Sequence, residues 1–329
     1  MKFTASSVTA ALAVVALAAT AEAATVASAA NADWLTFVTP NYTTWTGSAL
    51  PGSGDTASID HTVRADISTS VTNDVDEITA ASVQVNSGGT LNLWGGRMTL
   101  DAFSFNGGTL TAAQRTMIFR PTTIAVNDVP GNVWGQSKNQ NSKHAEIHTP
   151  TITGSGDITV MPGHSGQLFQ LDVTDPSGTA GFTGKLDVTR QSGRYDTGNQ
   201  SDSAWLKINQ NVTQGDASFS MSLNGIVRDW TEAGGGTAAT DDGISYNGYD
   251  MRDVNSEVWL NDLTIGGFSV PGRATAYTYA ELAAMNGGDV ANYLRTDGTD
   301  GLLGVAVPEP STLMLLDLAG LAMLGRRRS

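Results

Sequence analysis

Apolar residues in the middle of the chain alternate with polar ones, so their period is two rather than 3.6. The clearest case is the stretch 82–93, SVQVNSGGTLNL, in which a Ser-Gly-Gly turn separates two alternating runs. It predicts a strand, a turn and a strand, and the pattern returns over 103–111 as FSFNGGTLT. The Gly-Gly-Thr triplets at 88–90 and 107–109 are separated by nearly the length of one coil in a β-solenoid. The apolar residues expected on one buried face are Val83, Val85, Leu91 and Leu93.

A second set of short strands is predicted between positions 154 and 189. The segment 154–160, GSGDITV, has the same alternation, and the sequence L-D-V-T occurs at 171–174 and again at 186–189. In both copies Leu and Val are expected to point inward and Asp and Thr outward. Interpreted as neighbouring repeats, the copies place Asp172 and Asp187 at one strand spacing, about 4.8 Å.

These repeats resemble the autotransporter-associated β-helix repeats of exported bacterial proteins. The resemblance implies that the body, residues 24–306, is all-β and forms a right-handed parallel β-helix, clearest at 55–193 and 255–306. Each coil of such a solenoid buries its apolar face against its neighbours, and its ends need caps. Candidates for the N-terminal cap are Trp34, Phe37, Tyr42 and Trp45. Near the other end, 263–267 resembles a last rung and 277–282 a short helical insert.

The competing architecture is a β-sandwich or jelly roll, in which turns recur about every 8–12 residues. The stretch 195–260 is the least solenoid-like part of the body, because it contains Gly234-Gly235-Gly236 and Asp241-Asp242-Gly243 but few repeats. Two interpretations of this stretch stay open: long loops on the solenoid, or an inserted sandwich.

The N-terminal segment, 1–23, has the properties of a secretory signal peptide. Lys2 precedes an uncharged apolar run from Val8 to Ala19, and Ala21-Glu22-Ala23 forms an A-x-A-like cleavage site. The apolar run is too short for a comfortable membrane span. Because it is followed by a cleavage site, signal peptidase is the expected processing enzyme. Cleavage is predicted after Ala23 or Ala24, with Ala29 as the alternative.

The C-terminal segment, 307–329, combines three parts in order. The sequence V-P-E-P-S-T is followed by an apolar segment, 313–324, of about 18–22 Å at helical rise, and then by three arginines. This predicts a short membrane helix whose basic end stays on the cytoplasmic side, which leaves the body outside. Asp317 in the apolar segment costs about 2.5–3.5 kcal/mol on insertion, so the predicted anchoring is transient. The motif residues are Val307, Pro308, Glu309, Pro310 and Ser311, and the basic cluster is Arg326, Arg327 and Arg328.

This tail resembles the PEP-CTERM sorting signal of exported bacterial proteins. The family implies that an exosortase, a membrane protease-transpeptidase, cleaves near the Pro-Glu-Pro motif and passes the protein towards the surface. It also implies a Gram-negative host that makes exopolysaccharide, a membrane-anchored intermediate, and a final location at the cell surface or outside the cell. The same tail is sometimes labelled after ice-binding proteins, but a label on a sorting tail does not describe the domain that it sorts.

Composition adds constraints on turns and on partners. The chain has 25 Asp but only 7 Glu, together with 40 Thr and 37 Gly, which favours short strands and tight turns over long exposed helices. Its net charge is −14, from 18 Lys and Arg against 32 Asp and Glu, which argues against nucleic acid as a partner because the phosphates would repel it. The absence of cysteine excludes disulfide scaffolds, thiol nucleophiles and cysteine-ligated metals.

Two groups of residues are candidate metal ligands. His144, Glu146 and His148 share one face if they lie on a strand, but the neighbouring Asn, Gln and Lys residues indicate an exposed loop. Acidic turns near the C-terminal end offer oxygen ligands for calcium without the spacing of an EF-hand or a nonapeptide repeat. No metal or cofactor is therefore predicted, and calcium is kept as an alternative. The acidic residues in question are Asp241, Asp242, Asp250, Asp253, Asp297 and Asp300.

The sequence predicts an exported, non-enzymatic structural or adhesive protein of the cell surface or matrix, associated with exopolysaccharide or biofilm. The enzymatic alternative is a polysaccharide lyase or glycoside hydrolase that uses Asp172, Asp187 and Arg190, because such chemistry needs acids and a base on one face of adjacent coils. A third class is a carbohydrate-binding module with exposed rings that stack on sugars, although burial is the commoner fate of such rings. The candidate rings are Trp134, Trp205, Trp230 and Trp259.

An ice-binding surface is a further class with a defined pattern. It needs a regular T-x-T ladder, and the pairs in this chain do not recur at a constant period, so no such surface is predicted. The pairs are Thr44/Thr46, Thr109/Thr111 and Thr151/Thr153.

Overall fold

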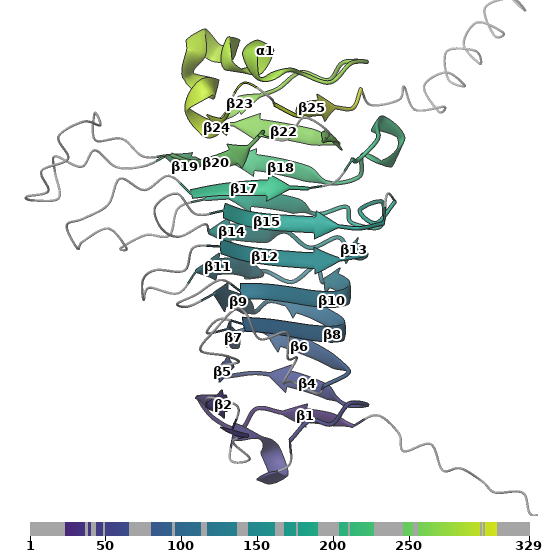
Figure 1. Ribbon diagram of the computed structural model, residues 1–329, viewed down its shortest axis with the longest axis vertical. Helices are drawn as coiled ribbons and strands as arrows, with labels where there is room; N and C mark the ends of the chain where they lie inside the picture. Colours follow the sequence, from purple (N-terminus) through teal and green to yellow (C-terminus); the bar gives the residue numbers. More distant parts are fainter. Residues whose placement is uncertain are drawn as a thin grey trace, which may run out of the picture.

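The chain forms an elongated stack of short coils, seen in a computed structural model (Figure 1). The structure describes residues 24–307 except 37–38, 41–43, 49, 66–79, 94–95, 113–116, 137–143, 162–167, 176, 190–203, 210, 227–245, 253–255, 297 and 299. Two long sheets run along the stack, here called sheet 1 and sheet 2, and almost all of their strand pairs are parallel. The chain alternates between them, so most coils give one strand to each sheet.

Sheet 1 begins at the N-terminal end of the stack and extends to the C-terminal end. Its parallel strands are β1 (Thr25–Ala27), β4 (Thr56–Ile59), β6 (Ser82–Asn86), β8 (Gly96–Asn106), β10 (Met117–Val126), β12 (His144–Thr149), β15 (Leu168–Val173), β17 (Ala204–Ile208), β20 (Tyr246–Asp250) and β24 (Leu294–Arg295). Two further strands join it, β13 (Thr151–Gly154) beside β10 and the antiparallel β19 (Gly225–Ile226) beside β20.

Sheet 2 contains the strand that follows the sheet 1 strand in most coils. Its parallel strands are β2 (Ala32–Thr36), β5 (Thr62–Ala65), β7 (Thr90–Leu93), β9 (Thr109–Ala112), β11 (Val133–Gln136), β14 (Ile158–Met161), β16 (Lys185–Val188), β18 (Ser220–Leu223) and β22 (Asp262–Ile265). Antiparallel strands flank both ends, β3 (Thr39–Pro40) and β23 (Phe268–Ser269). A third, shorter ladder pairs β21 (Glu257–Leu260) with β25 (Leu302–Val305).

The core lies between the sheets and is built by the period-two alternation. Val83, Val85, Leu91 and Leu93 are all buried, as the sequence predicts. The register keeps apolar residues over apolar residues, for example Leu91 opposite Leu110. Thr90 pairs with Thr109, so the spacing of the Gly-Gly-Thr triplets is one coil. The prediction of an all-β body with long parallel sheets, as a β-helix requires, is confirmed, while its handedness stays a prediction.

Polar side chains link the coils where the chain passes from sheet 1 to sheet 2. The amide of Asn86 donates to Asp60, that of Asn106 to Asn86, and that of Asn127 to Asn106, at 2.8, 2.8 and 3.3 Å. Asn132 is buried beside this column. Its side-chain oxygen Oδ1 accepts from Gly107 N at 2.7 Å, and its side-chain nitrogen Nδ2 donates to the backbone carbonyl oxygens of Asn127 and Asp157. These bonds satisfy backbone groups that the turns would otherwise bury without a partner.

The described part of 195–260 belongs to the solenoid. β17 pairs with β15, β18 with β16, and β20 with β17, all in parallel. The described residues therefore do not form an inserted sandwich. In this part of the stack the third ladder is extended by one more coil, because Val212 forms a parallel bridge with Val258 in β21.

Both ends of the stack are closed by packed side chains and short helices. At the N-terminal end Trp34 meets Trp45 edge to face, with ring centroids 4.7 Å apart, which confirms two of the predicted cap residues, whereas Phe37 and Tyr42 lie outside the described set. At the other end lie α1 (Tyr279–Ala283) and the 3-10 segment η5 (Met285–Tyr293). The predicted last rung at 263–267 is not the last, because β24 and β25 add a further turn.

No helix among the described residues is long and apolar enough to cross a membrane. The predicted membrane segment 313–324 and the predicted signal peptide 1–23 lie outside those residues.

Candidate functional site

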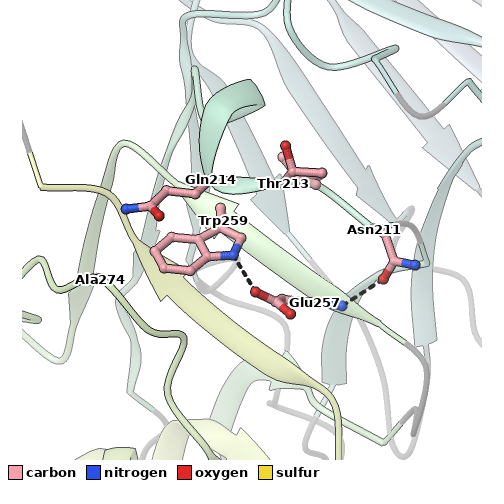
Figure 2. A pocket seen from close by; sticks show the side chains of 7 residues that line it. Asn211, Thr213, Gln214, Glu257, Trp259 and Ala274 are labelled. Carbon is pink, nitrogen blue, oxygen red and sulfur yellow. Dashed lines mark hydrogen bonds between the residues drawn. The ribbon is translucent and has the colours of Figure 1, made fainter.

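A pocket of about 580 Å³ opens on the outer side of the third ladder (Figure 2). Its floor is strand β21, in which Val258 and Leu260 point to the core while Glu257 and Trp259 alternate with them and point outward. Trp259 is only 4% exposed and yet is not part of the main apolar cluster. The indole is therefore covered from outside the core, by the loops that form the pocket.

Gly304 makes room for this indole. It pairs with Trp259 across the ladder, and a Cβ atom at Gly304 would lie 2.2 Å from Trp259 Cδ2 and within 2.6 Å of two more ring atoms. The ring face thus lies against the bare backbone of the next coil. A side chain at this position would lift the indole into the pocket.

The polar groups of the pocket are held by the coil register. The indole Nε1 of Trp259 donates to Glu257 Oε1 at 2.5 Å, and Glu257 N donates to Asn211 Oδ1 at 2.8 Å. Backbone bonds from Val212 N to Glu257 O and from Trp259 N to Val212 O align the two segments. In Figure 2 the side chain of Gln214 lies beside the indole.

The two walls of the pocket are braced. One contains the 3-10 turn η3 (Gln214–Asp216), before which Thr213 Oγ1 donates to Asp216 at 2.7 Å. The other contains Ala274, in a loop fixed by the Arg273 guanidinium, which donates to Glu281, to Thr275 O and to Ala276 O. The same guanidinium lies 3.6 Å from the centre of the Tyr277 ring. The pocket is therefore largely preformed.

Glu281 connects this brace to α1. It forms a capping box with Thr278, the residue that precedes the helix. Hydrogen bonds from Arg273 and then from Thr278 lower the pKa of Glu281 to about 2, so the carboxylate stays ionised at neutral and mildly acidic pH.

A second polar cluster lies on the outer face of sheet 1, away from the pocket. His148 Nδ1 is 2.8 Å from Asp172 Oδ2 on the next strand, and His148 Nε2 is 2.9 Å from Glu146 Oε2. The side chain of Gln170 donates to the other oxygen of Asp172 at 2.8 Å. Both ring nitrogens face carboxylates, which favours the doubly protonated imidazolium.

These contacts shift the pKa values of both partners. Hydrogen bonds from His148 to Asp172 and then to Glu146 raise the pKa of His148 to about 9, although burial opposes the charge. Burial acts to raise the pKa of Asp172, but the hydrogen bonds from His148 and Gln170 outweigh it and the pKa is lowered overall. The cluster is thus an ion pair between coils at neutral pH.

The stability that His148 provides is expected to depend on pH. Its folded-state pKa of about 9 exceeds the unfolded value of 6.5, so the contribution is complete below pH 6.5 and is lost as the pH rises through 9. After screening at these partly exposed side chains it amounts to about 1–2 kcal/mol. The His148→Gln variant should lose this pH dependence in urea unfolding at pH 6 and pH 9.5. An imidazole that titrates near 6.5 by NMR in the folded protein would contradict the prediction.

The candidate metal ligands that lie among the described residues are not assembled into a metal site. Among the described residues, no group of three or more His, Asp and Glu side chains is arranged to hold an ion. Asp250 is buried against Arg252 at 2.6 Å, and Asp300 accepts from Thr296. The segment with His148 is strand β12 rather than the predicted exposed loop. Residues outside the described set are Asp241, Asp242, Asp253, Asp297 and the side chain of His144.

The predicted stacking of Asp172 on Asp187 is wrong. Asp172 lies in β15 of sheet 1 opposite His148, whereas Asp187 lies in β16 of sheet 2 between Thr159 and Ser222. The two L-D-V-T copies are the two strands of one coil, because strands of both sheets bury one face and so have the same pattern. The third residue of the enzymatic alternative, Arg190, lies outside the described set.

The tryptophans proposed as sugar-stacking rings are mostly buried. Trp134 is 2% exposed and belongs to the core, and Trp205 is 9% exposed. Trp230 lies outside the described residues. Trp259 alone among the described candidates lines the pocket.

Hydroxyl side chains form a column on the outer face of sheet 2. Cα register places these residues directly over one another, with Val133 and Asp187 as the two interruptions. Members in adjacent coils are about 4.8 Å apart along the stack, and members on either side of an interruption are two coils apart. The column contains Thr62, Thr90, Thr109, Thr159, Ser222 and Thr264.

Of the seven residues that line the pocket, sequence reasoning identified Trp259 and missed the other six, including Asn211, Gln214 and Glu257. Asn211 and Glu257 lie in successive coils, and the stacking of these coils brings them into contact. The chain between them includes the undescribed stretch 227–245. The signal that was present is the alternation in E-V-W-L, which places Glu257 and Trp259 on the outer face.

Comparison with known families identifies the tail but not the body. The model of the PEP-CTERM protein-sorting motif matches residues 306–329. This motif implies export and exosortase-dependent, membrane-anchored sorting toward the cell surface. No curated protein and no solved structure matches the chain. The similarity of the body to autotransporter repeats therefore stays a prediction.

Proposed function

We propose that the protein is an exported structural component of the cell surface or extracellular matrix that associates with exopolysaccharide. The observation that carries this proposal is the junction between solenoid and tail. Ala306 N still donates to Leu260 O at 2.9 Å, although the match to the sorting motif begins at this residue, and the next residue, Val307, is 51% exposed. An elongated scaffold thus leads directly into a signal for delivery to the surface.

The outer surface of the scaffold supports association with a hydroxylated polymer. The hydroxyl column of sheet 2, with its two interruptions, and the column of Asn86, Asn106 and Asn127 between the sheets place polar side chains at the coil spacing along the stack. Such arrays offer hydrogen-bond donors and acceptors to sugar hydroxyls at many similar positions, so a polymer would not strongly prefer one position along the stack. The enzymatic alternative has less support, because its two described carboxylates lie on different sheets.

The N-terminal end is consistent with removal of a signal peptide. Ala24 N donates to Asp55 Oδ1 at 3.0 Å, and Gly52 N donates to Asp55 Oδ2 at 2.7 Å. These two bonds, that from Gly52 first, lower the pKa of Asp55. Cleavage after Ala23 would convert the Ala24 amide into an ammonium group beside a carboxylate that is already ionised.

Processing at both ends is the first test. Mass spectrometry of surface-released protein is expected to show a chain that begins at Ala24 or Thr25, according to whether cleavage follows Ala23 or Ala24, and that lacks Arg326–Arg328. A variant that ends at Ala306 should still lose its signal peptide but fail to be sorted. Released protein that keeps the arginine cluster would contradict exosortase processing.

Association with polysaccharide is the second part of the same test. The processed protein should co-sediment with exopolysaccharide from a matrix-forming culture. The variant that ends at Ala306 should do so as well, because the scaffold rather than the tail is proposed to make the contact. Retention that needs the tail would contradict a role of the solenoid surface.

A further inference from the structure

We propose that the pocket over Trp259 binds a non-acidic sugar unit of such a polysaccharide, an inference that rests on the proposed function. The first reason is the position of the indole. Trp259 lies outside the main core, is 4% exposed and is fixed between Gly304 and the pocket loops, so it gives the preformed cavity a rigid apolar wall against which the edge of a sugar ring can pack.

The second reason is the set of polar atoms beside that wall. Glu257 uses Oε1 to accept from the indole, and Asn211 uses its carbonyl to accept from Glu257 N. Among the residues that the structure describes, Glu257 Oε2, the Asn211 amide nitrogen and the Gln214 amide have no hydrogen-bond partner. These groups supply both acceptors and donors, which suits sugar hydroxyls because each hydroxyl both donates and accepts hydrogen bonds.

The third reason concerns charge and selects the class of sugar. Of the described residues that line the pocket, Glu257 is the one with an acidic or basic side chain, and the nearby Arg273 is paired with Glu281. An acidic sugar would place its carboxylate near Glu257 without a cation from the lining, and the chain itself carries a net charge of −14. A neutral or amine-bearing sugar avoids this repulsion.

The size of the pocket agrees with a small part of a chain. Its volume of about 580 Å³ lies within the range of about 300–1,000 Å³ that is usual for small-molecule sites. The two braced walls limit the rearrangement needed on binding, which preserves affinity for a weakly held ligand.

Calorimetry with defined tetrasaccharides tests this inference. Cellotetraose and chitosan tetramer are the non-acidic probes, and tetragalacturonate is the acidic one. The processed protein should bind at least one non-acidic probe and bind tetragalacturonate at least tenfold more weakly. The Glu257→Gln and Gln214→Ala variants should each weaken binding, by about tenfold for Glu257→Gln, which removes a charged acceptor.

The controls separate this inference from the proposed function. Asp262→Asn makes the same charge change as Glu257→Gln at an exposed strand position outside the pocket and should leave affinity unchanged. If the protein co-sediments with polysaccharide but both pocket variants bind as well as the parent, the pocket inference is overturned and the proposed function stands. Equal binding of tetragalacturonate would overturn the selectivity. If no polysaccharide is retained at all, the proposed function fails.

Discussion

Replacing Phe103 by alanine is expected to lower the free energy of unfolding by about 3–5 kcal/mol. The side chain is fully buried in β8, where it pairs with Val83 on one side and Ile124 on the other. Its ring meets those of Phe105 and Phe119 edge to face, each with centroids 4.9 Å apart. The variant would lose both contacts and leave a cavity between three successive coils, which close packing cannot readily refill.

Urea unfolding followed by circular dichroism measures this effect. Phe103→Leu, which keeps most of the volume, should cost less than about 1.5 kcal/mol. Thr122→Ala, at an exposed position of the neighbouring strand β10, should stay within about 0.5 kcal/mol of the parent. A Phe103→Ala protein within about 1 kcal/mol of the parent would mean that this aromatic layer does not hold the coils together.

The parts of the fold that could be predicted from sequence are those set by local alternation. The strand, turn and strand at 82–93 follow from period two, and the spacing of the Gly-Gly-Thr triplets equals one coil because Thr90 and Thr109 are paired in successive strands of sheet 2. The spacing of the L-D-V-T copies misleads for a physical reason. A strand of either sheet buries one face, so Asp172 and Asp187 look equivalent although they lie on different sheets.

The hydroxyl column has no constant period in the sequence, so a search for a regular ladder cannot find it. Thr90 and Thr109 are one short coil apart, whereas Ser222 and Thr264 are also one coil apart but have a much longer connection between them. Strand register aligns them, and loop length does not disturb it. The pocket could not be predicted from the sequence for the same reason, since strand register brings Asn211 and Glu257 together across a long connection.

Replacing Gly156 by alanine is expected to destabilise the protein by about 3 kcal/mol or more, although it adds one methyl group. A Cβ atom there would lie 2.0 Å from Asn127 O and 2.6 Å from Asn127 C, both backbone atoms of the preceding coil. No rotamer change relieves a contact with backbone, so the two coils must separate. Separation would strain the bond from Gly156 N to Val126 O and those made by the buried Asn132.

A matched glycine elsewhere isolates the effect of the coil contact. A Cβ atom at Gly54 would have nothing within 4 Å, and its φ is not in the left-handed region, so Gly54→Ala should leave stability unchanged or raise it by up to about 1 kcal/mol. Urea midpoints of the two variants test this contrast. Because both changes add the same methyl group and remove the same backbone freedom from the unfolded chain, any difference between them reports the distance between neighbouring coils. Equal midpoints would show that the coils at Asn127 and Gly156 are not packed backbone to backbone.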